Sequence, residues 1–420
     1  MKGDKTYLVR CGKLYDGYTD MLQLNMEILV KEGLIIAVGR NIQQPADAEV
    51  IDLSNLTVTP GLIDAHIHSD IWDWREYFAE MYAHGDDWKT LAHLHTAQRT
   101  LERGFTTIRC HAASSVGFGV VDVKKMINQG YFRGSRLCVT GHLFGSEGGH
   151  ADNGQHIAGN PALGLMAQAP NIGTGVSFFR RAVRNEVKYG ADFIKIFLSG
   201  GFSSPNDGPE EQQLSDEELE CIIRTARELK VPTTAHVYSS ELIQKLIKYG
   251  ITGIEHGSLM DKETVDMMEK SNIYLVPTMG CYDEIIHGNE DKMRQRSPEY
   301  QRKLRQYAKQ LRASRELIVH SNMRLGYGSD YVSVFQCYDS WHEYECMMKS
   351  GMDAFRILKA ATSVNAEILG MQDEIGSIEP GKYADLAGWH RDLLTDPQAI
   401  SQCDFVMKGG IIYPTVYAQN

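Results

Sequence analysis

From Pro60 to about Gly370, short apolar runs alternate with longer segments in which apolar residues recur every three or four positions. Eight of the apolar runs are typical of strands: GLIDAHIH, TTIRCH, RLCVTGH, FIKIFLSG, PTTAHVY, GIEHG, IYLVPTM and RLGYGSD. The longer segments predict helices over residues 89–103, 176–189, 216–229, 239–249, 261–271 and 300–321. Repeated strand-then-helix units predict an α/β fold, a (β/α)8 TIM barrel. An open doubly wound sheet is the alternative, but it needs fewer strands and usually carries a Gly-rich turn after the first.

The two ends of the chain have a different pattern, with short β segments broken by glycine-containing turns. The first 60 residues contain YLVRCGKLYDG, MEILVKEGLIIAVG and EVIDLSNLTVTP, and the last 50 contain GSIEPGKYADLAGW and FVMKGGIIY. We therefore expect residues 1–59 and 373–420 to form one small composite β-sandwich domain beside a barrel at 60–372.

Composition narrows the class of protein. Of 420 residues, 43% are hydrophobic and 23% charged, as in an ordinary globular protein, and the net charge of -11 argues against nucleic acid or an anionic membrane as partner. No stretch resembles a signal peptide or a membrane span, so we expect a cytoplasmic protein that acts on a small molecule. The eight cysteines form no C-x-x-C pair and are expected to be buried thiols.

Candidate chemistry gathers at the ends of the predicted strands. His66 and His68 are two residues apart in the first strand, so their side chains point to the same side and can reach one metal ion. Further polar groups end strands four, five, six and eight, where barrel enzymes place their active sites: Lys195, His236, His256 and Asp330. Each of these residues, taken alone, is also explained as a structural group that makes a buried hydrogen bond. Together, the five strand ends predict a metal site.

Lys195 lies in a strongly apolar strand, and an ammonium among histidine ligands would repel a metal ion unless it were neutral or chemically converted. Carboxylation by CO2 would turn the amine into a carbamate that can bridge two ions. The alternative is an ordinary lysine paired with a carboxylate on a neighbouring strand.

The chain resembles the amidohydrolase superfamily of metal-dependent hydrolases along nearly its whole length. The matching motifs are PGLIDAHIH at 60–68, GFTTIR at 104–109, ADFIKIFLSGG at 191–201, TAHVYS at 234–239, GIEHGS at 253–258, GSD at 328–330 and GSIEPGKYADL at 376–386. The segments 141–152 and 203–219, with Tyr238, are most similar to the branch of Xaa-Pro dipeptidase-like carboxypeptidases, ochratoxinase and phenylurea hydrolases.

This resemblance implies two divalent ions, with zinc as the default, bridged by carboxylated Lys195. The ligands would be His66, His68 and Asp330 for one ion and His236 and His256 for the other. It also implies a homo-oligomer.

The implied reaction is cleavage of an amide bond, in a dipeptide or N-acyl amino acid, by a hydroxide that bridges the two ions. Asp330 would take the proton of that hydroxide and pass it to the leaving amine. Tyr238 and His142 resemble residues that polarise the carbonyl or bind the substrate carboxylate.

Two other functions fit less well. An imidazolonepropionase-like or deaminase-like hydrolase of a cyclic amide or amidine generally lacks the lysine at position 195, and an inactive metal-binding scaffold has no need of Asp330.

One stretch departs from the branch, because Arg109 leads into Cys110, His111 and Ala112 where an aspartate and small residues are usual. The roles of His111, of His150 and of the aromatic run at 71–82 are left open, as is the identity of the substrate.

Overall fold

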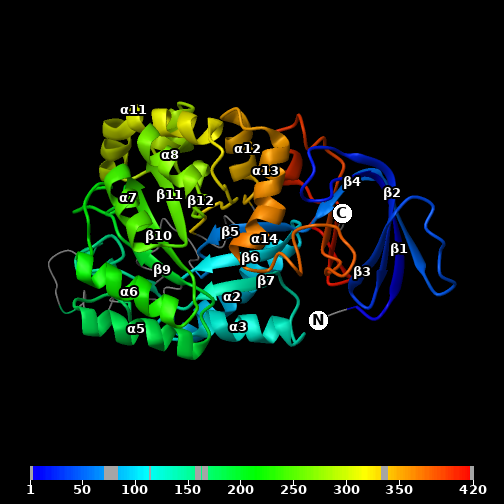
Figure 1. Cartoon of the computed structure of the whole chain (residues 1–420), viewed down its shortest axis with the longest axis horizontal. Helices are drawn as coiled ribbons and strands as arrows, with labels where there is room; N and C mark the ends of the chain where they lie inside the picture. Colours follow the sequence, from blue (N-terminus) through cyan, green and yellow to red (C-terminus); the bar gives the residue numbers. More distant parts are fainter. Residues whose placement is uncertain are drawn as a thin grey trace.

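The computed structural model describes residues 3–70, 84–112, 115–156, 162, 169–332 and 339–416. A β-sheet made from both ends of the chain lies at one end of the molecule, beside a larger body of strands and helices (Figure 1). The aromatic run at 71–82 lies outside the described residues.

The two ends of the chain share one seven-stranded sheet, in the order β15-β14-β13-β4-β1-β2-β3. Strand β13 pairs antiparallel with β4, with Leu386 opposite Pro60 and Trp389 opposite Thr57. The strands are β1 (Thr6–Leu14), β2 (Gln23–Lys31), β3 (Leu34–Gly39), β4 (Glu49–Pro60), β13 (Leu386–Trp389), β14 (Phe405–Lys408) and β15 (Ile411–Tyr413). The pairing of the two ends is as predicted. The two-layer sandwich and the domain boundaries stay predictions.

The larger body has parallel strands, as expected for an α/β fold, but in the described part of the chain they form two sheets and not one closed eight-stranded barrel. One sheet contains β5 (Leu62–Ile67), β6 (Phe105–His111) and β7 (Arg136–Thr140). The other contains β8 (Leu143–Phe144), β9 (Ile194–Phe197), β10 (Thr233–Ser239), β11 (Gly253–Leu259) and β12 (Tyr274–Val276).

The predicted eighth strand, residues 324–330, is not a regular strand. Its backbone bonds β12 on one side, where Gly326 N donates to Leu275 O at 2.8 Å, and β5 on the other, where Asp330 N donates to His66 O at 2.7 Å. A Cβ at Gly328 would lie 2.4 Å from the side chain of Val276 and 2.7 Å from that of His66. The segment therefore packs closely between the two sheets and joins them through backbone hydrogen bonds on both sides.

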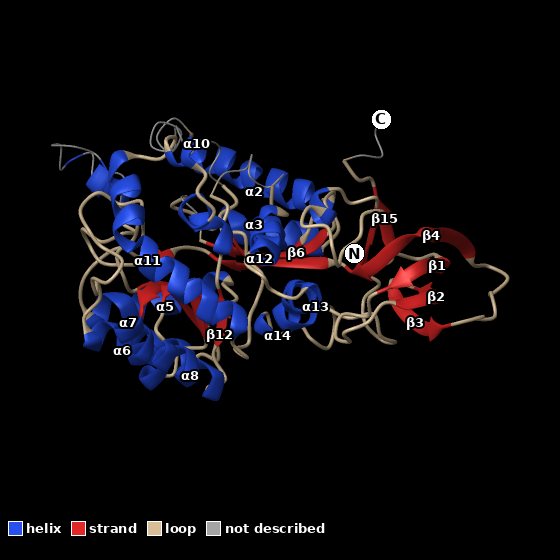
Figure 2. Cartoon of the chain, turned by 90° about the horizontal axis from the view of Figure 1, so that it is seen from above, coloured by secondary structure: helices blue, strands red, loops and turns tan. Residues whose placement is uncertain are grey.

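Helices lie on the outside of these strands (Figure 2). All six predicted helices are present, with ends shifted by at most three residues, and α6 starts with a capping box between Ser215 and Glu218. They are α2 (Asp86–Leu101), α5 (Val176–Tyr189), α6 (Asp216–Glu228), α7 (Ser240–Tyr249), α8 (Lys262–Lys270) and α11 (Pro298–His320). The sequence interpretation missed α3 (Gly119–Asn128), α9 (Asp283–Ile286), α10 (Glu290–Met293), α12 (His342–Lys349), α13 (Ala354–Lys359) and α14 (Asn365–Ile368).

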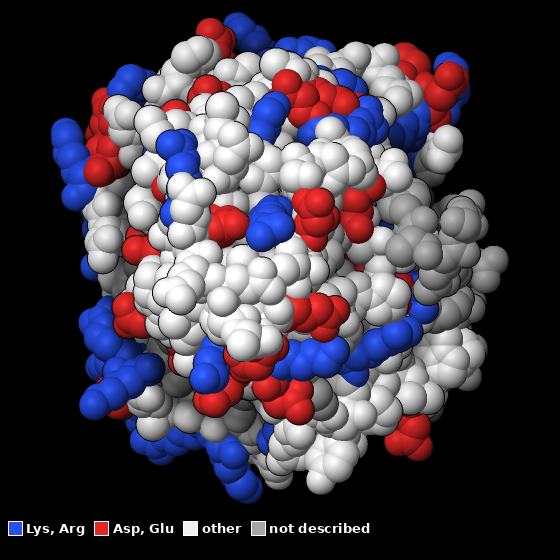
Figure 3. Space-filling model, turned by 90° about the vertical axis from the view of Figure 1, so that its right-hand side faces the viewer, with Lys and Arg blue, Asp and Glu red and all other residues white. Residues whose placement is uncertain are grey.

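Within the described part of the chain, no helix combines the length and the apolar character that crossing a bilayer requires. On the face seen in Figure 3, basic and acidic side chains are interspersed.

Candidate metal centre

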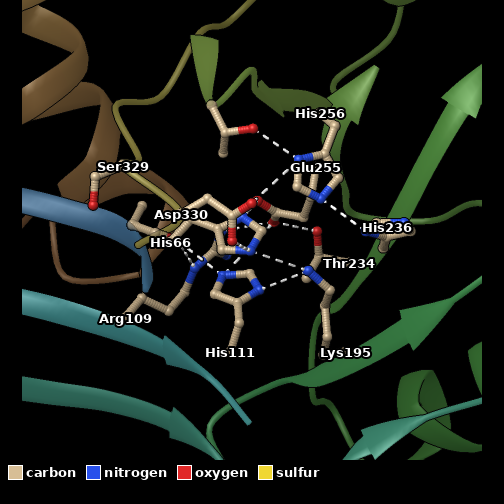
Figure 4. A network of polar contacts seen from close by, with 12 residues as sticks. His66, Arg109, His111, Lys195, Thr234, His236, Glu255, His256, Ser329 and Asp330 are labelled. Atoms are coloured by element: carbon tan, nitrogen blue, oxygen red, sulfur yellow. Dashed lines mark hydrogen bonds and ion pairs between the residues drawn. The ribbon is translucent and has the colours of Figure 1, made fainter. Parts of the chain in front are cut away.

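Side chains from β5, from β9 and from the segment that follows α11 point toward one another (Figure 4). The Nε2 atom of His66 lies 3.2 Å from Asp330 Oδ1 and 3.3 Å from Lys195 Nζ. The Nε2 atom of His68 lies 3.4 Å from the same Asp330 oxygen. Two histidines, a lysine and a carboxylate thus share one small volume, with His66 and Lys195 fully buried.

The ends of β10 and β11 add two more histidines. His236 Nδ1 lies 2.8 Å from His256 Nε2, and His256 Nδ1 lies 3.9 Å from Asp330 Oδ2. The ring of Tyr238 stacks on that of His256, with 5.2 Å between centroids. The structure therefore brings all six predicted ligands into one cluster, while their role as ligands stays a prediction.

Four residues at this cluster have left-handed backbones without being glycine: Ala112, His256, Thr278 and Asp330. In a regular strand, Glu255 and His256 would face opposite sides. The φ of 72° at His256 breaks that alternation, so Glu255 bonds His66 while His256 contacts His236 and Asp330. Because of this backbone conformation, β11 contributes two neighbouring side chains to the site, those of Glu255 and His256, instead of one.

Glu255 is a buried anion that the sequence interpretation did not single out. It pairs with His66 Nδ1 at 2.7 Å, Arg109 Nη2 at 2.8 Å and Thr234 Oγ1 at 2.5 Å. Burial alone would raise the pKa of Glu255, but the charge of Arg109 and the hydrogen bond with His66 outweigh it and lower the pKa to about 2. The ionised carboxylate keeps the proton of His66 on Nδ1 and leaves Nε2 to face Lys195 and Asp330.

Lys195 donates to two imidazole nitrogens, His66 Nε2 at 3.3 Å and His111 Nδ1 at 3.2 Å. His111 accepts at Nδ1 because its Nε2–H donates to Ala65 O at 2.9 Å. Burial lowers the pKa of Lys195 to about 8, so the neutral amine is accessible near neutral pH. A neutral amine is the form that reacts with CO2, as the carbamate hypothesis requires.

The donors present fit divalent cations. Burial lowers the pKa of His236 and of His256 well below the usual value, which keeps both imidazoles in the neutral, ligating form. Burial would raise the pKa of Asp330, but His66 and His68 hold it well below its usual range. Among the described residues, buried His236 Nε2 has no hydrogen-bond partner, as expected of an atom reserved for an ion. The donor atoms of His66, His256 and Asp330 all lie within 4.8 Å of one another.

A cavity of about 820 Å³ opens over this cluster. His150 lies in its wall, 4.8 Å from His236 in a stacked arrangement, and bonds Ser204 Oγ through Nδ1 at 2.7 Å. Aromatic side chains form much of the rest of the wall, and charged side chains of both signs lie among them: Phe197, Phe202, Tyr238, Tyr282, Tyr300, Trp341, Lys292, Arg296, Glu299, Asp339 and Glu343. The site thus combines a polar floor with a wall that is partly aromatic and partly charged.

His142 is not brought to the cavity. Its Nδ1 bonds Glu186 Oε1 at 2.7 Å and its Nε2 bonds Val116 O at 3.1 Å, so both ring nitrogens face acceptors on the outer side of β7. The histidine of the same motif that does line the cavity is His150. We therefore give His142 no part in the reaction proposed below.

Several known proteins are similar to this chain in sequence and in structure. Ochratoxinase of Aspergillus niger is 26% identical, over 97% of this chain and 87% of its own length. The solved structure of a Xaa-Pro dipeptidase with methionine in its active site has a TM-score of 0.86 at 27% identity, covering 98% of this chain and all of that one. A putative prolidase from Bifidobacterium longum has a TM-score of 0.81 at 26% identity, covering 99% of this chain and 97% of that one. The model of the amidohydrolase family matches residues 57–416, and the chain belongs to that family.

Proposed function

We propose that this protein is a binuclear metal-dependent hydrolase of amide bonds in dipeptides or N-acyl amino acids. The observation that carries the proposal is the position of Lys195, fully buried and 3.3 Å from His66 Nε2 in a cluster of histidines. A lysine at this place has no role in holding a single ion, whereas its carbamate supplies the anion that a pair of ions needs.

In the proposed centre, His66, His68 and Asp330 would hold one ion, His236 and His256 would hold the other, and carboxylated Lys195 would supply the anion shared by both. When bound, two divalent ions, zinc by default, would supply a strong nucleophile from water at neutral pH and neutralise charge on the reacting carbonyl oxygen. Glu255, with Arg109 behind it, orients His66 from the opposite side.

Asp330 is the proposed proton carrier. Its carboxylate faces His66 and His68 with one oxygen and Cys281 Sγ, 3.2 Å away, with the other. An ionised carboxylate here can accept a proton from the attacking water and deliver it to the leaving nitrogen.

Tyr238 is the proposed donor to the carbonyl oxygen. Burial raises the pKa of Tyr238 well above its usual value, so the phenol keeps its proton and can donate.

The wall of the cavity supports a substrate with an apolar group and a free carboxylate. Arg296 lines the cavity, held by Glu284 through Nε at 2.8 Å and stacked over the ring of Tyr300 at 5.0 Å. A fixed guanidinium suits a carboxylate, and the neighbouring aromatic rings suit an apolar side chain or acyl group. The relatives named above as ochratoxinase, Xaa-Pro dipeptidase and prolidase agree with this class of substrate.

The test uses purified protein expressed with added metal and bicarbonate. We expect hydrolysis of members of a library of dipeptides and N-acyl amino acids, and a Lys195→Ala variant that loses the bridged pair of ions together with activity. Retention of both ions and full turnover by that variant would return Lys195 to a structural role. Activity only on cyclic amides or amidines would instead support the imidazolonepropionase-like or deaminase-like alternative.

A further inference from the structure

A second cluster of metal-ligand side chains lies beside the cavity, on α9 and α12, outside the strand ends. It consists of Asp283 at the start of α9 and of His342 and Cys346, which lie on one face of α12 because they are four residues apart. His342 Nε2 lies 3.5 Å from Cys346 Sγ and 3.7 Å from Asp283 Oδ2. All three donor atoms lie within 4.8 Å of one another.

These distances match those between ligands of one tetrahedral ion. Ligand atoms at about 2.0–2.3 Å from zinc lie roughly 3.3–3.8 Å apart in tetrahedral geometry. Small side-chain shifts would therefore place one ion between the three donors. A cysteine sulfur, an imidazole nitrogen and a carboxylate oxygen also make up a donor set that zinc accepts.

Neighbouring residues already orient two of the three donors. His342 Nδ1–H donates to Glu345 Oε2 at 3.1 Å, which leaves Nε2 without a proton and aimed at Cys346 and Asp283. His287, four residues after Asp283, hydrogen-bonds Asp283 Oδ1 and leaves Oδ2 turned toward His342. Outer carboxylates and histidines of this kind are regular supports of protein metal sites.

We propose that Asp283, His342 and Cys346 bind a zinc ion at the rim of the cavity. The ion would join α9 to α12, and its fourth position would be open, since His342 itself lines the cavity. On binding, the bond between Sγ and its hydrogen breaks, the proton leaves to solvent and the thiolate electron pair forms the bond to the ion.

The groups around the cluster set what binding requires. Burial, with Asp283 and Glu343 nearby, raises the pKa of the Cys346 thiol, so an ion has to displace its proton for the sulfur to bind. Burial would also raise the pKa of Asp283, but its contacts with His287 and His342 outweigh it and lower the pKa. The cation now at the cluster is Lys292, whose Nζ donates to His342 Nε2 at 3.3 Å and must move away when an ion binds. Lys292 lies on the four-residue helix α10 and faces the cavity, which gives it room to do so.

The test is titration of the full-length, metal-depleted protein with Co²⁺, read from the near-ultraviolet charge-transfer absorption that a thiolate ligand gives with cobalt. We expect this band in the parent protein and its loss in Cys346→Ser and in His342→Gln. The matched control is Cys281→Ser, because Cys281 Sγ lies 3.2 Å from Asp330 in the strand-end cluster and is the other described thiol near a candidate ion. That variant should keep the band.

Two further variants sharpen the result. Glu345→Gln should keep the band but weaken cobalt binding about 10- to 100-fold, the usual cost of losing an orienting carboxylate. Lys292→Met keeps all three donors and must retain the band. Equilibrium dialysis against zinc should give one bound ion per chain fewer for Cys346→Ser than for the parent. This difference does not depend on how many ions the strand-end cluster binds. Absence of the band in the parent, its persistence in Cys346→Ser, or its loss in Cys281→Ser or Lys292→Met would each overturn the assignment.

Discussion

Substitution of Glu255 by glutamine gives the sharpest test of how the strand-end cluster is held. Glu255 is fully buried and accepts hydrogen bonds from Arg109, Thr234 and His66. The isosteric amide loses the charge that matches Arg109. Breaking a buried ion pair from one side costs about 3–5 kcal/mol, because the other charge stays buried without its partner. The free energy of unfolding of the metal-free protein, from urea titration, should fall by that amount.

The same variant should also bind metal more weakly, because the amide no longer fixes the proton of His66 on Nδ1. The expected loss is about 10- to 100-fold in affinity, measured by competition with a chelating dye. The matched control is Glu186→Gln, which removes a fully buried carboxylate from His142 and Gly141, away from the cluster. It should lower stability and leave metal affinity unchanged. Metal affinity that stays at the parent level in Glu255→Gln, or falls equally in Glu186→Gln, would refute the orienting role of Glu255.

Three other substitutions test separate parts of the structure. Asp330→Asn should lower kcat by at least about 100- to 1000-fold with a smaller loss of metal, since the amide cannot accept a proton, and near-parental turnover with both ions bound would exclude the proton-carrier role. Tyr238→Phe should cost about 10- to 1000-fold in kcat and leave the shape of the pH profile intact, whereas a changed profile would point to a role in proton transfer. Burial lowers the pKa of Lys408 to about 8 in the folded protein. Between about pH 8 and pH 10.5, the unfolded chain therefore binds more protons at this lysine than the folded protein does. The free energy of unfolding consequently rises with pH through that range. Lys408→Met should abolish a rise of up to about 3 kcal/mol in the unfolding free energy, and an unchanged rise would assign it to other groups.

The parts of the site that could be predicted from the sequence are those governed by local periodicity. His66 and His68 follow from the two-residue repeat of a strand, and Lys195, His236 and Asp330 follow from their places at strand ends. Glu255 could not be found in this way, because strand alternation puts it on the face opposite His256. The left-handed backbone at His256 breaks this alternation, and a histidine at that position does not by itself predict a left-handed backbone. The one available signal was the position of Glu255 directly before a predicted ligand.

The remaining differences arise from contacts between distant segments. The eighth strand was expected from its sequence pattern, but residues 324–330 instead make isolated backbone bonds to β12 at one end and to β5 at the other. His142 and His150 share one motif, and it is the bond to Glu186 on α5 that directs His142 away from the cavity. Asp283 on α9 lies far in the sequence from His342 and Cys346 on α12, so only the packing of these helices reveals the second cluster.

The shared sheet also determines the order in which the protein can be completed during synthesis. Strand β4 lies between β1 and β13, and β13 begins only at Leu386. Until that point leaves the ribosome, β4 is an open edge that carries Leu56 and Val58, both buried in the finished sheet. Uncovered apolar edges pair with other chains. We therefore expect this edge of β4 to be open to pairing with other chains for as long as the residues before Leu386 are being translated.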